Sequence, residues 1–314
     1  MLNLRLTTAL AGAVLLAVVG TAHSADPAEK VTQAGPGGYV SIGGVIFKRS
    51  DPKGGTIVAA NPGGAPFSTS GDYDFGWKAG IDASAGINFW GTEGIEARAL
   101  YYDTGTTFQF TTPGNFIGAG FTGPGGTLFQ SEYDTKLTSF EVNWRHRMFD
   151  DQLTLLAGVR SIGVNDNLHI HLNTNVAHGH YDYDNDLLGG QIGAEWAVFK
   201  PSDPFQLNLV GKIGVYSLHS EGGIYEFQGS NFIGSFTNEF SKVAYAGEVG
   251  VTAGYHLTDN IVLRGGYQLF WLDKVSLGSN AAAVSLLNPS LLRGDVARDS
   301  LMFHGFNVGV TLTW

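Results

Sequence analysis

The segment DFGWKAGIDASAGINF, residues 74–89, alternates between apolar and polar residues without interruption. From Phe75 to Phe89 every odd position is apolar, and from Asp74 to Asn88 every even position is polar, charged or glycine. Because successive side chains of a β-strand point to opposite faces, this pattern predicts a strand with one apolar and one polar face. The strand is longer than the usual globular strand of about five or six residues, and its length suits a tilted crossing of a bilayer.

The same alternation recurs and predicts further strands at about 39–49, 93–103, 137–149, 152–164, 186–199, 205–216, 242–257, 261–273 and 301–314. Four joins are short (GTEG, DD, KPSDP and TDN), whereas the other five run about twenty to thirty residues. Short turns on one side and long loops on the other are typical of bacterial outer-membrane barrels. In lipid, an open sheet edge would leave backbone groups unpaired. We therefore expect residues 39–314 to form an all-β, closed antiparallel transmembrane β-barrel of about ten strands, with short periplasmic turns and long extracellular loops.

The N-terminus has the pattern of a secretory signal peptide. Arg5 precedes an apolar run from about Ala9 to Val19, and small residues follow at Ala22 and Ser24. This predicts a cleaved signal peptide over residues 1–24 and a periplasmic lead over residues 25–38. An even number of strands then places both termini in the periplasm of a Gram-negative-type envelope.

Composition excludes several classes of function. The chain has no cysteine, so disulfides, thiolate metal sites and a cysteine nucleophile are excluded. Its formal net charge of −10 makes it a poor nucleic-acid binder. It has no GxSxG, Walker or HExxH motif, and GAGFTG at residue 118 lacks the strand-to-helix context of a dinucleotide site. We expect no catalytic activity and no cofactor.

Charged residues on the polar strand faces are expected to point into the lumen. Eight-stranded barrels are already filled by side chains, and open channels need about sixteen strands, so ten strands imply a plugged or very narrow lumen. The charges could form a buried network that holds the barrel, or they could line a narrow selective pore for small solutes. The set is Lys78, Asp82, Glu96, Arg98, Glu141, Arg145, Arg160, Glu195, Lys212, Glu248 and Arg264.

Aromatic residues cluster near the short-turn ends of the strands, where outer-membrane barrels carry an interfacial girdle. The alternative is that these residues fill the core of a soluble sandwich. The predicted girdle is Phe89, Trp90, Trp144, Trp196, Phe199, Tyr255 and Trp314. A terminal aromatic residue resembles the C-terminal signature of outer-membrane proteins, so the last strand is expected to contact the barrel-assembly machinery.

The stretch HIHLNTNVAHGHYDYDND, residues 169–186, is the most unusual polar segment, and we expect it to form the third long loop. Its histidines are either hydrated loop residues or ligands for Zn²⁺ or Cu²⁺: His169, His171, His178 and His180. A calcium loop is excluded, because Leu187 stands where that loop needs glycine and Gly193 where it needs glutamate.

Apolar residues in the long loops could fold into the barrel mouth as a plug, or contact a partner or lipopolysaccharide. They include Phe108, Phe110, Phe116, Phe121, Phe129 and Phe232. The omptin proteases also have ten strands, but they work with acidic and histidine residues at the extracellular mouth. The adjacent pair Asp150 and Asp151 lies in a predicted periplasmic turn, on the wrong side.

From Leu137 to Trp314 the chain resembles the β-barrel porin-7 family of outer-membrane proteins. The similarity is carried by SFEVNWRHR, LTLLAGVRSIGVND, NDLLGGQIGAEW, AGEVGVTAGYHLTDNIVLRGGYQLFWLDKVSL and FHGFNVGVTLTW. The resemblance implies a porin-like barrel. From the strand pattern and the lumen charges we expect a narrow diffusion pore or a structural barrel, in contact with outer-membrane lipid and lipopolysaccharide. The alternative function is surface recognition through the long loops, with the barrel as scaffold.

Overall fold

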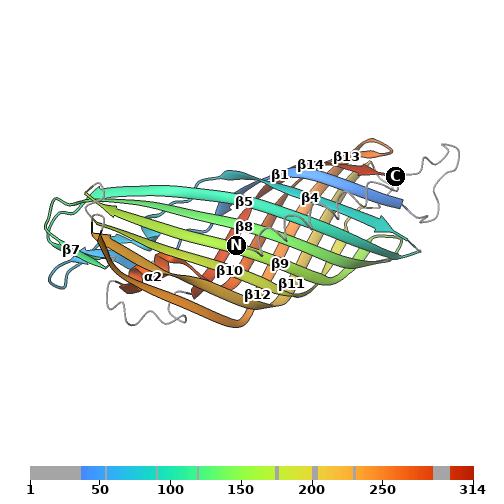
Figure 1. The fold of residues 1–314 in the computed structure, drawn as a ribbon. Helices are drawn as coiled ribbons and strands as arrows, with labels where there is room; N and C mark the ends of the chain where they lie inside the picture. Colours follow the sequence, from blue (N-terminus) through green and yellow to red (C-terminus); the bar gives the residue numbers. More distant parts are fainter. Residues whose placement is uncertain are drawn as a thin grey trace.

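Ten long antiparallel strands close into a barrel in the computed structural model, which describes residues 37–53, 55–89, 91–118, 120–173, 177–199, 204–228, 231–285 and 298–314 (Figure 1). The barrel closes because β1 pairs with both β14 and β4. The ring order is β1, β14, β13, β12, β11, β10, β9, β8, β5 and β4. The predicted fold class is therefore confirmed. The signal peptide over residues 1–24 and most of the lead over residues 25–38 lie outside the described residues, and β1 already includes Gly37 and Gly38.

The barrel strands are β1 (Gly37–Arg49), β4 (Lys78–Asn88), β5 (Glu93–Thr111), β8 (Leu128–Met148), β9 (Leu153–Leu172), β10 (Ala177–Ala197), β11 (Phe205–Gln228), β12 (Asn231–Thr258), β13 (Ile261–Ser276) and β14 (Arg298–Thr313). Close connections join β4 to β5, β8 to β9, β10 to β11 and β12 to β13 at one end, here called the turn end. Gly38 pairs with Trp314 there, so both ends of the described barrel lie at the turn end. The opposite end is called the loop end.

The strands extend much further toward the loop end than the sequence pattern predicted. Leu172 of β9 faces Ala177 of β10, and Gln228 of β11 faces Asn231 of β12. The predictions of a third and a fourth long loop were therefore wrong, because these strand pairs continue as extended hairpins. In this part of the barrel the outward-facing side chains are polar as well as apolar. The alternation between apolar and polar residues therefore disappears from the sequence, although the strands remain paired.

The remaining elements lie at the loop end and come from the first, second and last loops. Four short strands form a separate sheet in the order β3 (Pro66–Thr69), β2 (Thr56–Ala60), β6 (Phe116–Gly118) and β7 (Phe121–Gly123). The short helix η1 (Ser70–Asp72) follows β3, and α2 (Gly278–Ser285) contacts β9, β10, β2 and β6. Among the described residues, helix length and hydropathy give no candidate for a transmembrane helix.

Apolar side chains fill the inside of the barrel over much of its length. The mid-barrel core includes Phe47, Leu137, Leu218, Phe270 and Phe303, each fully buried. The loop-end core lies beyond it and includes Ile57, Phe75, Tyr133, Tyr181 and Ala281.

Several loop phenylalanines join the loop-end core. Phe116, Phe121 and Phe129 are buried in it, and Phe108 and Phe110 pack against it. Phe232 differs, because its side chain is 57% exposed. Phe75 was expected on the outer face with Trp77, but β4 begins only at Lys78, so Phe75 turns inward and is buried.

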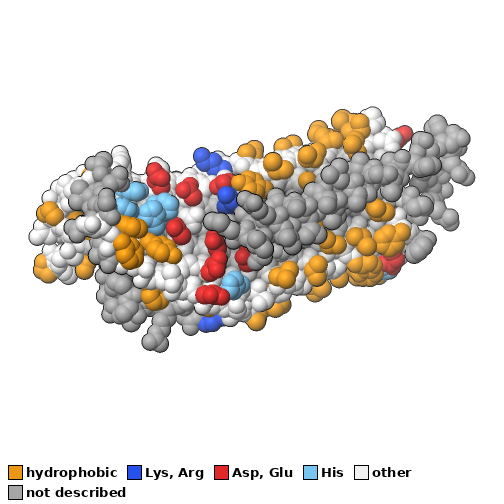
Figure 2. Space-filling model, viewed as in Figure 1, with side chains coloured by type: hydrophobic (Ala, Val, Ile, Leu, Met, Phe, Trp, Pro, Cys, Tyr) orange, Lys and Arg blue, Asp and Glu red, His pale blue; other side chains and the backbone are white. Residues whose placement is uncertain are grey.

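The outer face carries a belt of exposed apolar side chains near the turn end, part of which is visible in Figure 2. Leu188 is 66% exposed and Ile192 is 64% exposed, as expected of residues that face lipid. On β12 the belt runs from Val243 to Tyr255. At roughly 3.3 Å per residue and a strand tilt of about 40°, it rises roughly 30 Å, close to the thickness of a bilayer hydrocarbon core.

Candidate functional site

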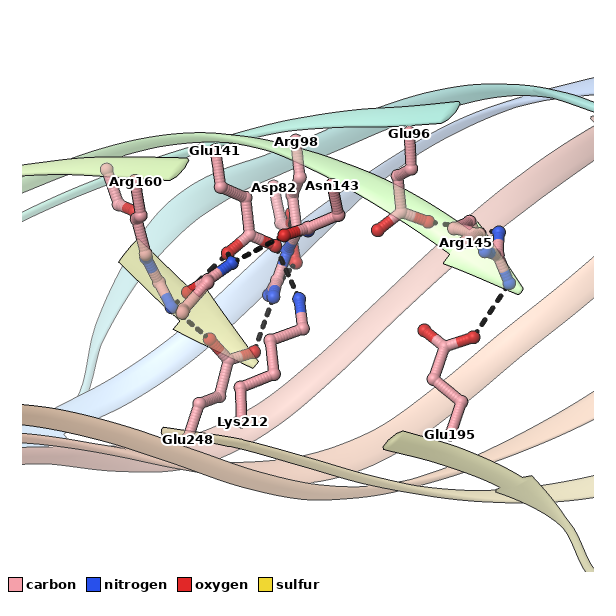
Figure 3. Close-up of polar contacts among 12 residues, drawn as sticks. Asp82, Glu96, Arg98, Glu141, Asn143, Arg145, Arg160, Glu195, Lys212 and Glu248 are labelled. Carbon is pink, nitrogen blue, oxygen red and sulfur yellow. Dashed lines mark hydrogen bonds and ion pairs between the residues drawn. The ribbon is translucent and has the colours of Figure 1, made fainter. Parts of the chain in front are cut away.

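A buried charge network crosses the lumen at the level of the apolar belt. Strands β5 and β12 lie on opposite sides of the ring, so the ion pair between Arg98 and Glu248 spans the lumen (Figure 3). Arg98 also donates two hydrogen bonds to Asp82, over 2.9 Å from Nε and 2.7 Å from Nη2. Arg160 of β9 donates from Nη1 to Glu248 Oε2 over 2.8 Å. Planar guanidinium groups suit contacts of this kind with several carboxylates, and they connect four strands across the interior.

Glu141 of β8 is the third carboxylate of this network. It accepts hydrogen bonds from Lys212 Nζ and, over 2.8 Å, from Gln191 Nε2. Arg160 Nη1 lies 3.4 Å from Glu141 Oε2, so Arg160 is shared with Glu248. The side chains of Glu141 and Lys212 are 1% and 4% exposed. Charges this deeply buried are costly unless they are paired, and here each one is paired.

A second group of charges lies closer to the turn end. Arg145 of β8 donates to Glu195 of β10 over 2.8 Å and to Glu96 of β5 over 3.1 Å. Arg145 also donates to the Tyr39 hydroxyl over 2.7 Å, and Tyr39 donates to Glu96. Three predicted lumen residues and one tyrosine therefore form one connected group.

The last two predicted lumen residues lie outside these networks. Arg264 donates a hydrogen bond to Ser41 Oγ on the far side of β14. Lys78 is the first residue of β4, at the end of this strand that points toward the loop end. It is exposed, and the neighbouring strand β5 continues beyond it.

Sequence reasoning missed a fully buried ion pair beneath the loop-end core. Arg49 Nη2 lies 2.8 Å from Asp166 Oδ2, and both side chains are 0% exposed. Asp166 also accepts from Tyr133 over 2.6 Å and from the Gly278 backbone N–H over 2.8 Å, so it holds the start of α2. The Arg49 guanidinium lies 4.2 Å from the ring centroid of Phe75. Asp166 and Arg160 are an even number of residues apart and therefore point to the same face of β9. Extending the predicted strand 152–164 by two residues would have placed Asp166 in the lumen.

A polar cavity opens below the charge network at the turn end. Its volume is about 330 Å³, and its lining includes Tyr39, Glu195, Asn208, Thr252 and His256. Arg98, Lys212 and Glu248 lie at its inner end. The cavity lining therefore reaches inward as far as the network, and the two apolar cores lie beyond it in the described barrel.

The predicted girdle residues lie near the turn end, on or beside the outer face. Trp144, Trp196, Phe199, Tyr255 and Trp314 are between 42% and 53% exposed. Phe89 is half-buried, and Trp90 lies outside the described residues. Exposed aromatics also occur at the opposite edge of the belt, at Trp77, Tyr101 and Tyr245, a set that the sequence analysis did not identify.

The four histidines lie on the outer face of the β9–β10 hairpin, beyond the belt. His169 pairs in register with His180, and His171 pairs with His178. His169 Nε2 lies 3.1 Å from Asp182 Oδ1, and this hydrogen bond raises the pKa of His169. Burial and the neighbouring imidazoles lower the pKa of His180. The predicted hydrated loop is thus a half-buried array of side chains with fixed spacing.

No model of a protein family matches this chain, and no curated protein sequence does. The resemblance to the β-barrel porin-7 family therefore stays a prediction.

Solved structures do match. The outer membrane protease OmpT from Escherichia coli aligns with a TM-score of 0.53 and 11% identity, covering 92% of this chain and 99% of that chain. The attachment invasion locus protein Ail of Yersinia pestis aligns with a TM-score of 0.31 and 9% identity, covering 90% and 100%. A FadL homologue of Pseudomonas aeruginosa aligns with a TM-score of 0.29 and 8% identity, covering 89% of each chain. The match to OmpT shows a shared fold, and the chain therefore has the fold of bacterial outer-membrane β-barrel proteins.

Proposed function

We propose that this protein resides in a bacterial outer membrane, with the loop end outside the cell and both termini in the periplasm. The apolar belt supports this placement, because its height matches a hydrocarbon core. Aromatic residues at both edges of the belt support it as well. The partners of the barrel surface would be outer-membrane lipid and lipopolysaccharide, and the last strand would contact the barrel-assembly machinery during insertion.

Of the two alternatives for a porin-like barrel, a narrow diffusion pore and a structural barrel, we propose the structural barrel with a closed lumen. The single observation that carries this proposal is the network around Glu248, which joins opposite walls of the barrel. Two apolar cores lie beyond it and fill much of the described lumen toward the loop end, which supports a closed form. The porin-7 resemblance fits such a barrel, and the proposal assigns no catalytic residue to it.

Reconstitution into planar lipid bilayers tests the closed lumen. We expect no discrete conductance steps above the lipid background, while a general porin of sixteen strands in the same bilayers gives clear steps. Insertion is verified separately, by the slower gel mobility of the boiled sample relative to the folded barrel. Reproducible single-channel steps from correctly folded protein would overturn the proposal in favour of the narrow diffusion pore.

Surface recognition is a second candidate, favoured by the extended hairpins. Aromatic side chains remain accessible at the loop end: Phe232 is 57% exposed and Tyr225 is 37% exposed. Phe232 also contacts Phe227, with ring centroids 5.5 Å apart. Serine substitutions at these three positions should reduce the adhesion of cells that display the full chain to epithelial cells. Unchanged adhesion at equal surface display would count against this candidate.

A further inference from the structure

Two imidazoles and a carboxylate converge on the outer face of the β9–β10 hairpin. One ligand atom from each of His169, His180 and Asp182 lies within 4.8 Å of the other two. The rings of His169 and His180 are 4.2 Å apart between centroids. Because Zn²⁺ binds imidazole nitrogen and carboxylate oxygen at about 2.0–2.2 Å, its ligand atoms lie only about 3–4 Å from one another. We propose that these three residues form a binding site for a divalent transition metal of the Zn²⁺ and Cu²⁺ class.

The β-ladder holds these ligands in place. His169 and His180 face each other directly across the pair of strands, so their side chains leave the sheet on the same side. Asp182 follows His180 by two residues and therefore shares that side. Asp182 already accepts a hydrogen bond from His169, so little side-chain freedom is lost when a cation replaces the shared proton. The spacing is thus a property of strand register and not of a loop conformation.

Neighbouring side chains can complete the coordination. Strand β8 flanks β9 on the edge away from β10, and its Glu132 pairs in register with His169. The ring of His178 lies 5.6 Å from that of His180, and the ring of His171 lies 6.5 Å from it, measured between centroids. A three-residue site leaves a fourth tetrahedral position, which Glu132, another imidazole or water can take.

The surrounding charges favour a cation. The same face of β8, β10 and β11 carries carboxylates and few cationic side chains, as Figure 2 shows around the histidine cluster. The acidic residues on this face are Glu132, Asp134, Asp184, Asp186 and Glu221. Two nitrogen ligands select transition metals over Ca²⁺ and Mg²⁺, which prefer oxygen ligands alone. The site is independent of whether the lumen conducts, because it lies on the outer face.

Isothermal calorimetry of the folded full-length protein in detergent, titrated with ZnCl₂, tests the assignment. We expect one saturable site per chain. The double variant His169→Asn with His180→Asn should bind at least about 100-fold more weakly, because it loses two of three ligands. His219→Asn is the matched control. His219 is an exposed histidine on the outer face of β11, where it pairs in register with Ser241 of β12, and it lies outside the cluster.

Each result decides for or against the site. Saturable binding that His219→Asn keeps and the double variant loses supports it, provided that both variants show the gel mobility of the folded barrel. Absence of heat in the unsubstituted protein, or equal binding in the double variant, overturns it. Loss of binding only in a His171→Asn and His178→Asn variant would assign the ion to the other histidine pair and also overturn it. Equal affinity for CaCl₂ would refute the metal class.

Discussion

Replacing Glu248 with glutamine removes the charge that faces both Arg98 and Arg160 in the lumen. The side chains of Glu248 and Arg160 are 1% and 3% exposed, so water can compensate little of the lost charge. Removing one partner of a buried ion pair typically costs about 3–5 kcal/mol. Here Arg98 keeps its two hydrogen bonds to Asp82, and Arg160 keeps Glu141 at 3.4 Å. We therefore expect the lower end of that range, a loss of about 3 kcal/mol in the free energy of unfolding.

Urea titration of the barrel in lipid vesicles, with the folded fraction taken from gel mobility, measures this loss. Asp74→Asn is the matched control, because the Asp74 side chain pairs with Lys48 at 2.8 Å but is 80% exposed. A surface pair of this kind should contribute less than about 1 kcal/mol. If Glu248→Gln and Asp74→Asn shift the unfolding midpoint equally, the reasoning that the network supports the barrel is refuted.

Three further predictions concern the loop end. Asp166→Asn should destabilise the barrel by about 3 kcal/mol in the same titration, because it leaves Arg49 buried without its carboxylate; an unchanged midpoint would contradict this. Gly278→Leu should displace α2, since even a Cβ there would lie 2.5 Å from the Tyr181 carbonyl oxygen, and limited proteolysis should then cleave near α2 in the variant alone. Burial raises the pKa of Glu226, so the folded state binds this proton more tightly than the unfolded state and stability falls as pH rises through the folded pKa. Glu226→Gln should therefore raise the melting temperature at pH 7 and flatten its dependence on pH below 7; parallel pH curves for the two proteins would disprove it.

Alternation predicted the ten barrel strands because lipid imposes a strong contrast between the two faces. Leu188, Ile192 and Trp196 of β10 show the contrast clearly, with more than half of each side chain exposed on the apolar outer face. Above the belt the contrast disappears, since His180 and Asp182 occupy the same outer face. The sequence pattern therefore predicts a loop where the structure has a hairpin with a continuous ladder.

The sequence could not predict which charged residues of the lumen form ion pairs, because the pairing depends on the order of the strands around the closed barrel. Arg98 and Glu248 come from strands on opposite sides of the barrel, and alternation says only that both point inward. Metal binding was one of two alternatives that the sequence offered for the four histidines, and it did not include Asp182. The pairing of His169 with His180 required the register between two strands, which the sequence pattern does not contain.

The filled lumen is the central claim, and cysteine accessibility tests it most directly because the chain has no native cysteine. Thr252 lines the turn-end cavity, whereas Ser220 lies beyond the charge network, is 0% exposed and bonds to Ser276 over 2.9 Å. We predict that a membrane-impermeant maleimide added at both ends of the folded barrel labels the Thr252→Cys variant within minutes and leaves the Ser220→Cys variant unlabelled until urea unfolds it. Equal labelling rates for the two variants in the folded state would contradict a closed lumen.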